Sequence, residues 1–151
     1  MGLTSPVSRL GDHRRYNVAV EYFRSMMADL DGAPIVGRSS RGLGVRVPED
    51  IAPDETGAVT PGTGGMSVAP TVRGLPNHRR PRPMGLGSTG PASDRVYEIE
   101  EPALLEGTLA VRPDPRAPDV HAFVEPAHRA PLASYEGNLV FTRPAWRQVW
   151  P

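Results

Sequence analysis

A predicted strand at residues 120–127 carries two residues that could do chemistry on one face. One is a histidine that could act as a base, and the other is a glutamate that could supply a carboxylate. His121, Phe123 and Glu125 alternate with apolar residues there, so their side chains point to the same side. Four strand steps, about 13 Å, separate His121 from Glu125. The pair cannot hold one small atom, but it could contact two parts of a longer ligand. A half-buried structural histidine and an exposed strand glutamate are the plain alternatives.

A glycine-rich segment leads into a serine. Thr63 is followed by the pair Gly64 and Gly65, and adjacent glycines permit positive φ and a close approach of the backbone to a ligand. Ser67 alternates with apolar neighbours, which directs its hydroxyl away from the apolar face. No strong strand precedes the segment and no helix follows it, so a plain turn is the alternative to a phosphate-cradling loop.

An arginine lies on a second predicted strand, at residues 43–47. The apolar residues there alternate with Gly44 and Arg46, which places the arginine opposite the apolar face. A guanidinium is always charged and matches phosphate oxygens with two hydrogen bonds. Arg46 is therefore either a phosphate clamp or a surface ion-pair partner of Glu49 or Asp50.

The composition excludes several chemistries. The chain has 151 residues, 17 basic and 17 acidic residues, no cysteine and, reading along it, no lysine. Disulfides, zinc ribbons, thiol nucleophiles, Walker-type lysines and Schiff bases are therefore absent. None of the four histidines has a helical metal-ligand spacing, so we predict no metal site. The segment 65–69 ends in alanine where a nucleophile elbow needs glycine, which disfavours acyl transfer.

The same counts bear on location and partners. No run of 18 apolar residues exists, and the first residues lack the apolar core of a secretory signal peptide. We therefore expect a cytoplasmic protein with no membrane partner, and leave open its delivery into a target cell without a signal peptide. A net charge of zero makes nucleic acid an unfavoured partner. The basic cluster Arg79, Arg80 and Arg82 keeps an RNA-directed activity as a weaker alternative.

The elements that must position these residues form one predicted domain at 16–151, after a flexible tail at 1–15. Apolar residues spaced by three and four predict a helix over 16–31, which either packs on a sheet or binds a partner. Prolines and glycines at 70–94 predict a long mobile loop. No second domain and no internal repeat are visible.

Most of the regular elements that we predict lie in the C-terminal half of the chain. We predict strands at 96–99 and 109–112, a helical turn at Leu104 and Leu105, and a helix that begins near Pro131. Trp146 and Trp150 close the chain as expected packing anchors.

Three of these pieces occur in an order that resembles a known family. The segment 61–68 reads Pro-Gly-Thr-Gly-Gly-Met-Ser-Val, the strands at 96–99 and 109–112 follow, and 121–127 reads His-Ala-Phe-Val-Glu-Pro-Ala. This order resembles the small ADP-ribosyltransferase-like toxins first recognised as type VI secretion effectors. The resemblance covers about residues 43–135.

The resemblance implies an α+β fold, a split twisted β-sandwich that holds NAD between two sheets, here with the N-terminal helix and the long Pro/Gly-rich loop added. In that superfamily a first-strand Arg or His contacts the cofactor, a Ser or Tyr shapes the nicotinamide pocket, and a later Glu stabilises the oxocarbenium-like centre. By position, Arg46 and Ser67 resemble the first two, and His121 or Glu125 the third. Thr63, Gly64 and Gly65 would add backbone contacts to the pyrophosphate.

The function implied is that of a bacterial toxin that acts on or from NAD, as an ADP-ribosyltransferase or an NAD glycohydrolase. Such a toxin implies a cognate immunity protein or antitoxin and a macromolecular target, which the sequence does not identify. The alternative is a non-catalytic binding or cargo module of a secretion or phage-like particle that keeps the fold without turnover.

Overall fold

The computed structural model describes residues 20–150, which fold into eight strands, two α-helices and four 3-10 turns. The strands are β1 (Glu21–Met27), β2 (Ala58–Val59), β3 (Met66–Val68), β4 (Asp94–Glu100), β5 (Leu109–Pro113), β6 (Ala122–Pro126), β7 (Ala130–Pro131) and β8 (Arg147–Trp150). The helices are α2 (Glu101–Glu106) and α3 (Leu132–Phe141), and the 3-10 turns are η1 (Val72–Gly74), η2 (Asn77–Arg79), η3 (Arg82–Met84) and η4 (Arg143–Ala145). The predicted tail at 1–15 lies outside the described residues.

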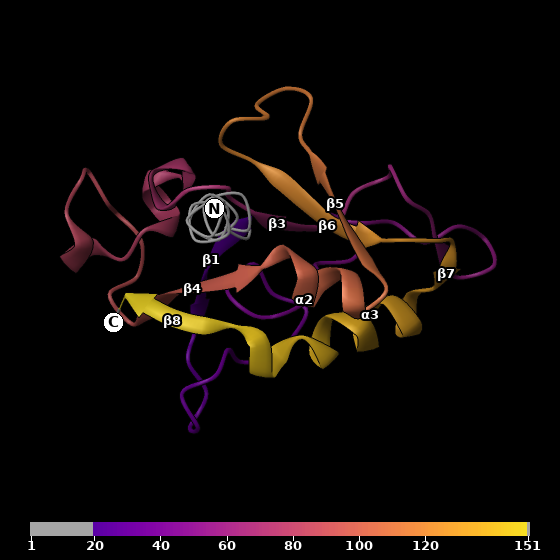
Figure 1. Ribbon diagram of the computed structural model, residues 1–151, viewed down its shortest axis with the longest axis horizontal. Helices are drawn as coiled ribbons and strands as arrows, with labels where there is room; N and C mark the ends of the chain where they lie inside the picture. The colour runs from indigo at the N-terminus through magenta and orange to yellow at the C-terminus, as the bar shows by residue number, and fades with distance from the viewer. Residues whose placement is uncertain (1–19, 151) are drawn as a thin grey trace, which may run out of the picture.

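Two three-stranded antiparallel sheets form the frame (Figure 1). Their strand orders are β1-β4-β8 and β3-β6-β5, and β2 pairs with β7 as a small ribbon. The two sheets meet where Phe23 of β1 bridges Ala69, just after β3, with backbone bonds of 2.8 and 2.9 Å. Antiparallel sheets with few helices confirm the predicted α+β class.

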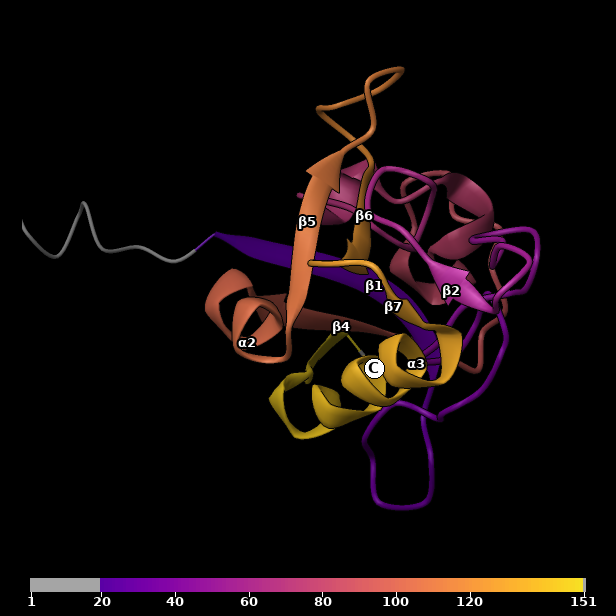
Figure 2. The same ribbon diagram turned by 90° about the vertical axis from the view of Figure 1, so that its right-hand side faces the viewer.

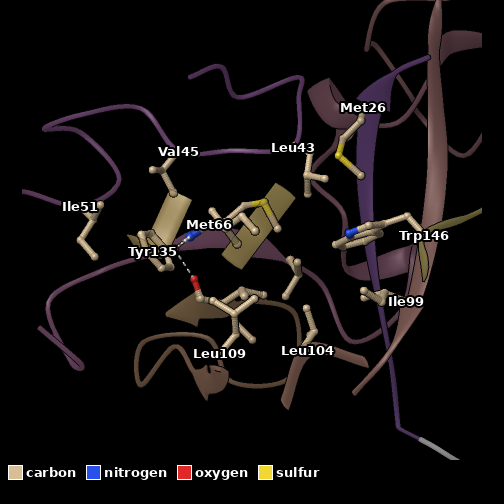
Figure 3. Packing of buried hydrophobic residues seen from close by; sticks show 14 of the residues in the cluster. Met26, Leu43, Val45, Ile51, Met66, Ile99, Leu104, Leu109, Tyr135 and Trp146 are labelled. Carbon is tan, nitrogen blue, oxygen red and sulfur yellow. Dashed lines mark hydrogen bonds between the residues drawn. The ribbon is translucent and has the colours of Figure 1, made fainter. Parts of the chain in front are cut away.

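One hydrophobic core lies between the sheets and the helices. Met66 of β3, Leu104 of α2, Tyr135 of α3 and Trp146 are among its buried members (Figure 3). The Tyr135 hydroxyl accepts a hydrogen bond from the Met66 N–H (3.1 Å) and donates one to the Val124 carbonyl (2.6 Å). Helix α3 is thereby fastened to β3 and β6. Figure 2 shows α2 and α3 at the same end of the molecule, below β5 and β6.

The helix predicted over 16–31 is wrong: residues 21–27 form strand β1. Every residue of β1 pairs with β4, from Glu21 opposite Glu100 to Met27 opposite Asp94. Both faces of β1 are covered, so apolar residues occur on both sides and the alternation of a half-buried strand is lost. Leu30, which the helical spacing placed on the apolar face, is fully exposed in the turn after β1.

The strand predicted at 43–47 is also absent. Leu43 makes an isolated parallel bridge with Val36, and the chain then turns. The turn is closed by reciprocal bonds, from Arg46 N–H to the Asp50 carboxylate (2.7 Å) and from Asp50 N–H to the Arg46 carbonyl (2.9 Å). Leu43 and Val45 are buried as the alternation predicted, but the aspartate four residues after Arg46 competes with a sheet for its backbone.

Other predicted elements are confirmed. The strands at 96–99 and 109–112 lie within β4 and β5, the strand at 120–127 contains β6, and α2 and α3 occur where helices were expected. Trp146 lies in the core and Trp150 packs against a second cluster around Leu75. Strand β8, which follows η4, has too little pattern to be predicted. No helix within residues 20–150 is long and apolar enough to cross a membrane.

The segment 70–94 forms η1, η2 and η3 rather than any long regular element. Leu75 and Arg80 are buried within it, so the segment packs against the sheet formed by β1, β4 and β8 through the Leu75 cluster. Its mobility stays a prediction.

Candidate functional site

A cavity of about 270 Å³ lies beside the junction of the two sheets. Its wall comes from β1, β3, the residues just before β6, the turn at 46–50 and the η1–η2 segment. Its charged and hydrogen-bonding lining residues include Arg24, Arg46, Asp50, Ser67, Arg79 and His121. Val68, Leu75 and Val120 add apolar surface. The site therefore draws residues from segments far apart in the chain.

Arg24, in the middle of β1, is a site residue that the sequence prediction missed. Its guanidinium donates to the carbonyls of Gly42 (2.9 and 3.1 Å) and Ser67 (2.7 Å). Weaker bonds reach the carbonyls of Ser39 (3.3 Å) and Gly44 (3.5 Å). Burial lowers the pKa of Arg24 to about 10. The missed signal was an arginine among large apolar residues, with Tyr22 and Phe23 before it and two methionines after Ser25; a cation buried in such a setting needs acceptors, which here are backbone carbonyls.

The cavity carries more positive than negative charge. Three arginines line it, Arg24, Arg46 and Arg79, against one carboxylate, Asp50. Arg46 forms an ion pair with Asp50 at 2.8 Å, so that alternative from the sequence is confirmed. Within residues 20–150 no ion pair includes Arg24 or Arg79. Burial, then the charge of Arg46, lower the pKa of Arg79. Such a surface attracts an anion.

A chain of hydrogen bonds leads from Ser67 away from the cavity. Ser67 Oγ lies 3.0 Å from His121 Nε2, and His121 Nδ1 lies 2.7 Å from the carboxylate of Asp114. Ser67 lies on β3 opposite Phe123, and His121 immediately precedes β6. The alternation at 66–68 predicted correctly that the hydroxyl leaves the apolar face: Met66 and Val68 are buried. The partnership with Asp114 was not foreseen.

Glu125 lies away from this group. Its side chain is buried, accepts a hydrogen bond from the Gly62 N–H (2.7 Å) and pairs with Arg112 Nε (3.1 Å). It is not among the residues that line the cavity. His121 and Glu125 flank Phe123, whose ring packs edge-on against the imidazole at 4.6 Å between centroids and under the Arg112 guanidinium at 4.8 Å. The structure thus brings Arg46, Ser67 and His121 together, and leaves Glu125 outside.

The backbone at Gly64 and Gly65 lies close to other segments of the protein rather than to the cavity. A Cβ built on Gly64 would lie 2.1 Å from the Asp50 carbonyl oxygen, and one on Gly65 would lie 2.4 Å from that of Val124. Gly65 N–H also donates to the Asp50 carbonyl at 2.9 Å. The Thr63 hydroxyl bonds the Thr60 carbonyl at 2.7 Å. None of these three residues lines the cavity; the pair instead packs the segment before β3 against β6 and the 46–50 turn.

A metal ion has no cluster of ligands in the described part of the chain. Within residues 20–150 no group of three His, Cys, Asp or Glu side chains is placed to hold one. The functional groups that the cavity offers are therefore guanidinium, imidazole, hydroxyl and carboxylate.

The chain matches no protein-family model, no curated protein and no solved structure.

Proposed function

We propose that the protein binds NAD in the cavity between its sheets and is a toxin-like protein with an ADP-ribosyltransferase fold. It transfers ADP-ribose from NAD, or hydrolyses NAD, and so inhibits growth of a target cell. The charge of the cavity is the observation that carries the proposal. Three arginines against one aspartate leave a surplus of positive charge, which suits the doubly ionised pyrophosphate of a dinucleotide.

The arrangement of the sheets supports the same proposal. The resemblance implies a cofactor site between the two sheets of a split sandwich, and here the cavity adjoins the Phe23–Ala69 bridge at which the two sheets meet. Ligand sites of about 300–1,000 Å³ are usual for drug-sized molecules. A cavity of about 270 Å³ therefore takes part of NAD, and the remainder lies over the surrounding surface.

The proposal gives Arg24 the role first expected for Arg46. Arg24 lies on the first strand of the fold and lines the cavity. Its Nη1 bears two hydrogens, of which the bond to Ser67 uses one, so one donor can meet a ligand oxygen. Arg46 contributes from the opposite turn, and Ser67 with His121 contacts the ribose or the carboxamide.

Cleavage of the bond between nicotinamide and ribose requires a carboxylate near the ribose carbon. Loss of nicotinamide develops positive charge at the ribose carbon, and a nearby carboxylate stabilises that transition state more than the ground state. Glu125 remains our predicted candidate, although reaching the ligand would require it to leave Arg112 and Gly62. If Glu125→Gln keeps full nicotinamide release, the carboxylate role of Glu125 is wrong.

Two measurements test the function. The first is induced expression in bacteria of the wild type and of Arg79→Ala and Ser67→Ala, with colony counts and cellular NAD followed together. Arg82→Ala is the matched control, because Arg82 is exposed, lies three residues from Arg79 and does not line the cavity. Toxicity with falling NAD, lost in the two site variants and kept in Arg82→Ala, would support NAD consumption. Toxicity at steady NAD would favour modification of a target.

The second measurement uses purified protein, with NAD binding by calorimetry and nicotinamide release by chromatography. Binding with release supports the enzyme, and binding without release supports the non-catalytic module. The absence of both toxicity and NAD binding would contradict the proposal. A toxin also predicts a neutralising immunity protein or antitoxin, which rescue of toxic expression by neighbouring genes would reveal.

The hydrogen-bonded series Ser67, His121, Asp114 favours a second candidate, a serine hydrolase. That series, with these atoms in contact, is the one that activates a serine nucleophile. Ser67 Oγ would attack an ester carbonyl, its proton would pass to His121 Nε2, and the alcohol would leave with that proton, which leaves the acyl group on Ser67. A water molecule, deprotonated by His121, would then attack this acyl group and release the acid, and His121 would return the proton to Ser67 Oγ. Covalent labelling of Ser67 by a fluorophosphonate probe, lost in His121→Ala, would support this candidate; an unlabelled wild type would remove it.

A further inference from the structure

Asp114 belongs to the site through His121, although it does not line the cavity. It directly follows β5, as His121 directly precedes β6, and its backbone N–H bonds the His121 carbonyl at 3.0 Å. The two residues thus continue the β5–β6 pairing by one step beyond Pro113 and Ala122. Their relative position is set by the backbone ladder, which holds the side chains side by side.

The Asp114 carboxylate is buried and accepts several hydrogen bonds. One oxygen lies 2.7 Å from His121 Nδ1, and the other accepts the Arg116 backbone N–H at 2.9 Å. The bond to His121, then the bond from the Arg116 backbone, hold the pKa of Asp114 at about 2. An ionised carboxylate has no proton to donate. The proton between Asp114 and His121 therefore belongs to Nδ1.

The position of that proton decides which atom donates in the hydrogen bond between His121 and Ser67. In a neutral imidazole with hydrogen on Nδ1, the Nε2 atom is an acceptor. Ser67 Oγ, 3.0 Å away, must then donate its hydrogen to Nε2. Its remaining capacity is that of an acceptor, and Ser67 lines the cavity.

We infer that Asp114 is a positioning residue that fixes the direction of these hydrogen bonds, so that Ser67 presents an acceptor oxygen to the ligand. The ligand group seated at Ser67 is then a donor, a hydroxyl or an amide N–H. This inference rests on the proposed function only in its choice of NAD, whose ribose hydroxyls and carboxamide supply such donors. Asp114 thereby selects the ligand without touching it.

The tautomer is tested by nitrogen NMR of the histidine rings in the full chain, without any ligand. The His121 signals are assigned by their loss in His121→Asn. We expect a protonated Nδ1 and an unprotonated Nε2 in the wild type, and a shift toward the other tautomer in Asp114→Asn, whose amide can donate to Nδ1. Asp114→Glu keeps a carboxylate and should restore the wild-type pattern. Arg116→Gln is the matched control, because it also contacts Asp114 but from an exposed side chain.

The effect on binding is measured by NAD titration of the same proteins. Asp114→Asn should weaken NAD binding or turnover about 10- to 100-fold, by analogy with the loss seen when the group that orients a metal-ligating histidine is removed. Asp114→Glu should recover most of that loss, and Arg116→Gln should show none. Unchanged backbone amide spectra separate this effect from misfolding.

Each outcome decides a separate question. A wild-type ring protonated on Nε2, or on both nitrogens, would overturn the inference, as would an unchanged tautomer in Asp114→Asn. If the tautomers behave as expected but NAD binds neither to the wild type nor to any variant, the inferred direction of the hydrogen bonds stands and the proposed function fails. If NAD binds equally to wild type and Asp114→Asn, Asp114 has no part in ligand selection.

Discussion

The guanidinium of Arg24 is satisfied by backbone carbonyls rather than by a carboxylate, because its hydrogen bonds reach Gly42, Ser67, Ser39 and Gly44. A buried charge is tolerated when its hydrogen bonds are made. Since carbonyls leave the positive charge uncancelled, the same side chain joins three chain segments and keeps the cavity electropositive. One residue thus both stabilises the fold and sets the charge of the cavity.

Replacement of Arg24 by alanine should destabilise the fold. The carbonyls of Gly42 and Ser67 lose their donors, and a buried unsatisfied carbonyl costs about 1–3 kcal/mol. We expect a loss of about 2–4 kcal/mol in the free energy of unfolding, measured by urea denaturation. Arg73→Ala, an exposed control, should change it by less than about 0.5 kcal/mol. Equal midpoints for the two variants would show that the carbonyl bonds contribute nothing.

Acid should destabilise the protein partly through Asp114. Folding lowers the pKa of Asp114 from its usual range to about 2, chiefly through the bond to His121. The unfolded chain therefore binds a proton first as the pH falls, so stability is present above about pH 4 and is lost toward pH 2. Urea midpoints between pH 5 and 2 should fall less steeply in Asp114→Asn than in the wild type. Parallel curves would contradict this.

At the scale of elements, local pattern succeeded where one face of a strand is buried. Met66 and Val68 alternate with Ser67, and the predicted orientation of that hydroxyl is confirmed. The pattern failed for β1, because pairing and packing on both sides remove the alternation that marks a strand. It failed at Arg46 because the Asp50 side chain draws the backbone into a turn.

The glycine pair shows the same limit. Its sequence indicates a close approach but cannot say to what, and the partner is the carbonyl of Val124 on β6 or of Asp50. Gly65→Ala should therefore cost about 3–5 kcal/mol through the clash and the positive φ together. Gly57→Ala separates the two terms, because Gly57 also has positive φ but open space around its Cβ position; about 1–2 kcal/mol is expected there. Thermal unfolding of both variants gives the comparison.

At the scale of the whole molecule, the site is assembled from distant segments. Arg24, Ser67, Arg79 and His121 become neighbours only when β1 meets β3 and the η1–η2 segment packs beside them. No local pattern encodes that meeting, so Arg79 was interpreted only as part of a basic cluster. The alternation at 66–68 and at 120–127 singles out Ser67 and His121 separately, but it does not predict that the two side chains meet.

A ligand that bridges the two sheets should stabilise the entire fold. NAD at about 100 times its Kd adds about 2.7 kcal/mol, which raises the Tm of a chain of this size by about 5–10 °C. Arg79→Ala should abolish most of that rise, and Arg82→Ala should keep it. Scanning calorimetry with and without NAD measures the shift. A Tm that NAD leaves unchanged in the wild type would argue against binding.

The connection between β5 and β6 has a consequence for finding relatives of this chain. The backbones of Asp114 and His121 are joined by a hydrogen bond that continues the β5–β6 pairing, and His121 N–H also bonds the Ala117 carbonyl at 3.0 Å. The residues between Asp114 and His121 therefore form a loop whose two ends are held together. Insertions and deletions can change the length of such a loop without separating the two residues at its ends. A genomic search should therefore leave the gap between this aspartate and histidine variable, and hold fixed the glycine pair, the serine and the His-x-x-x-x-Pro segment.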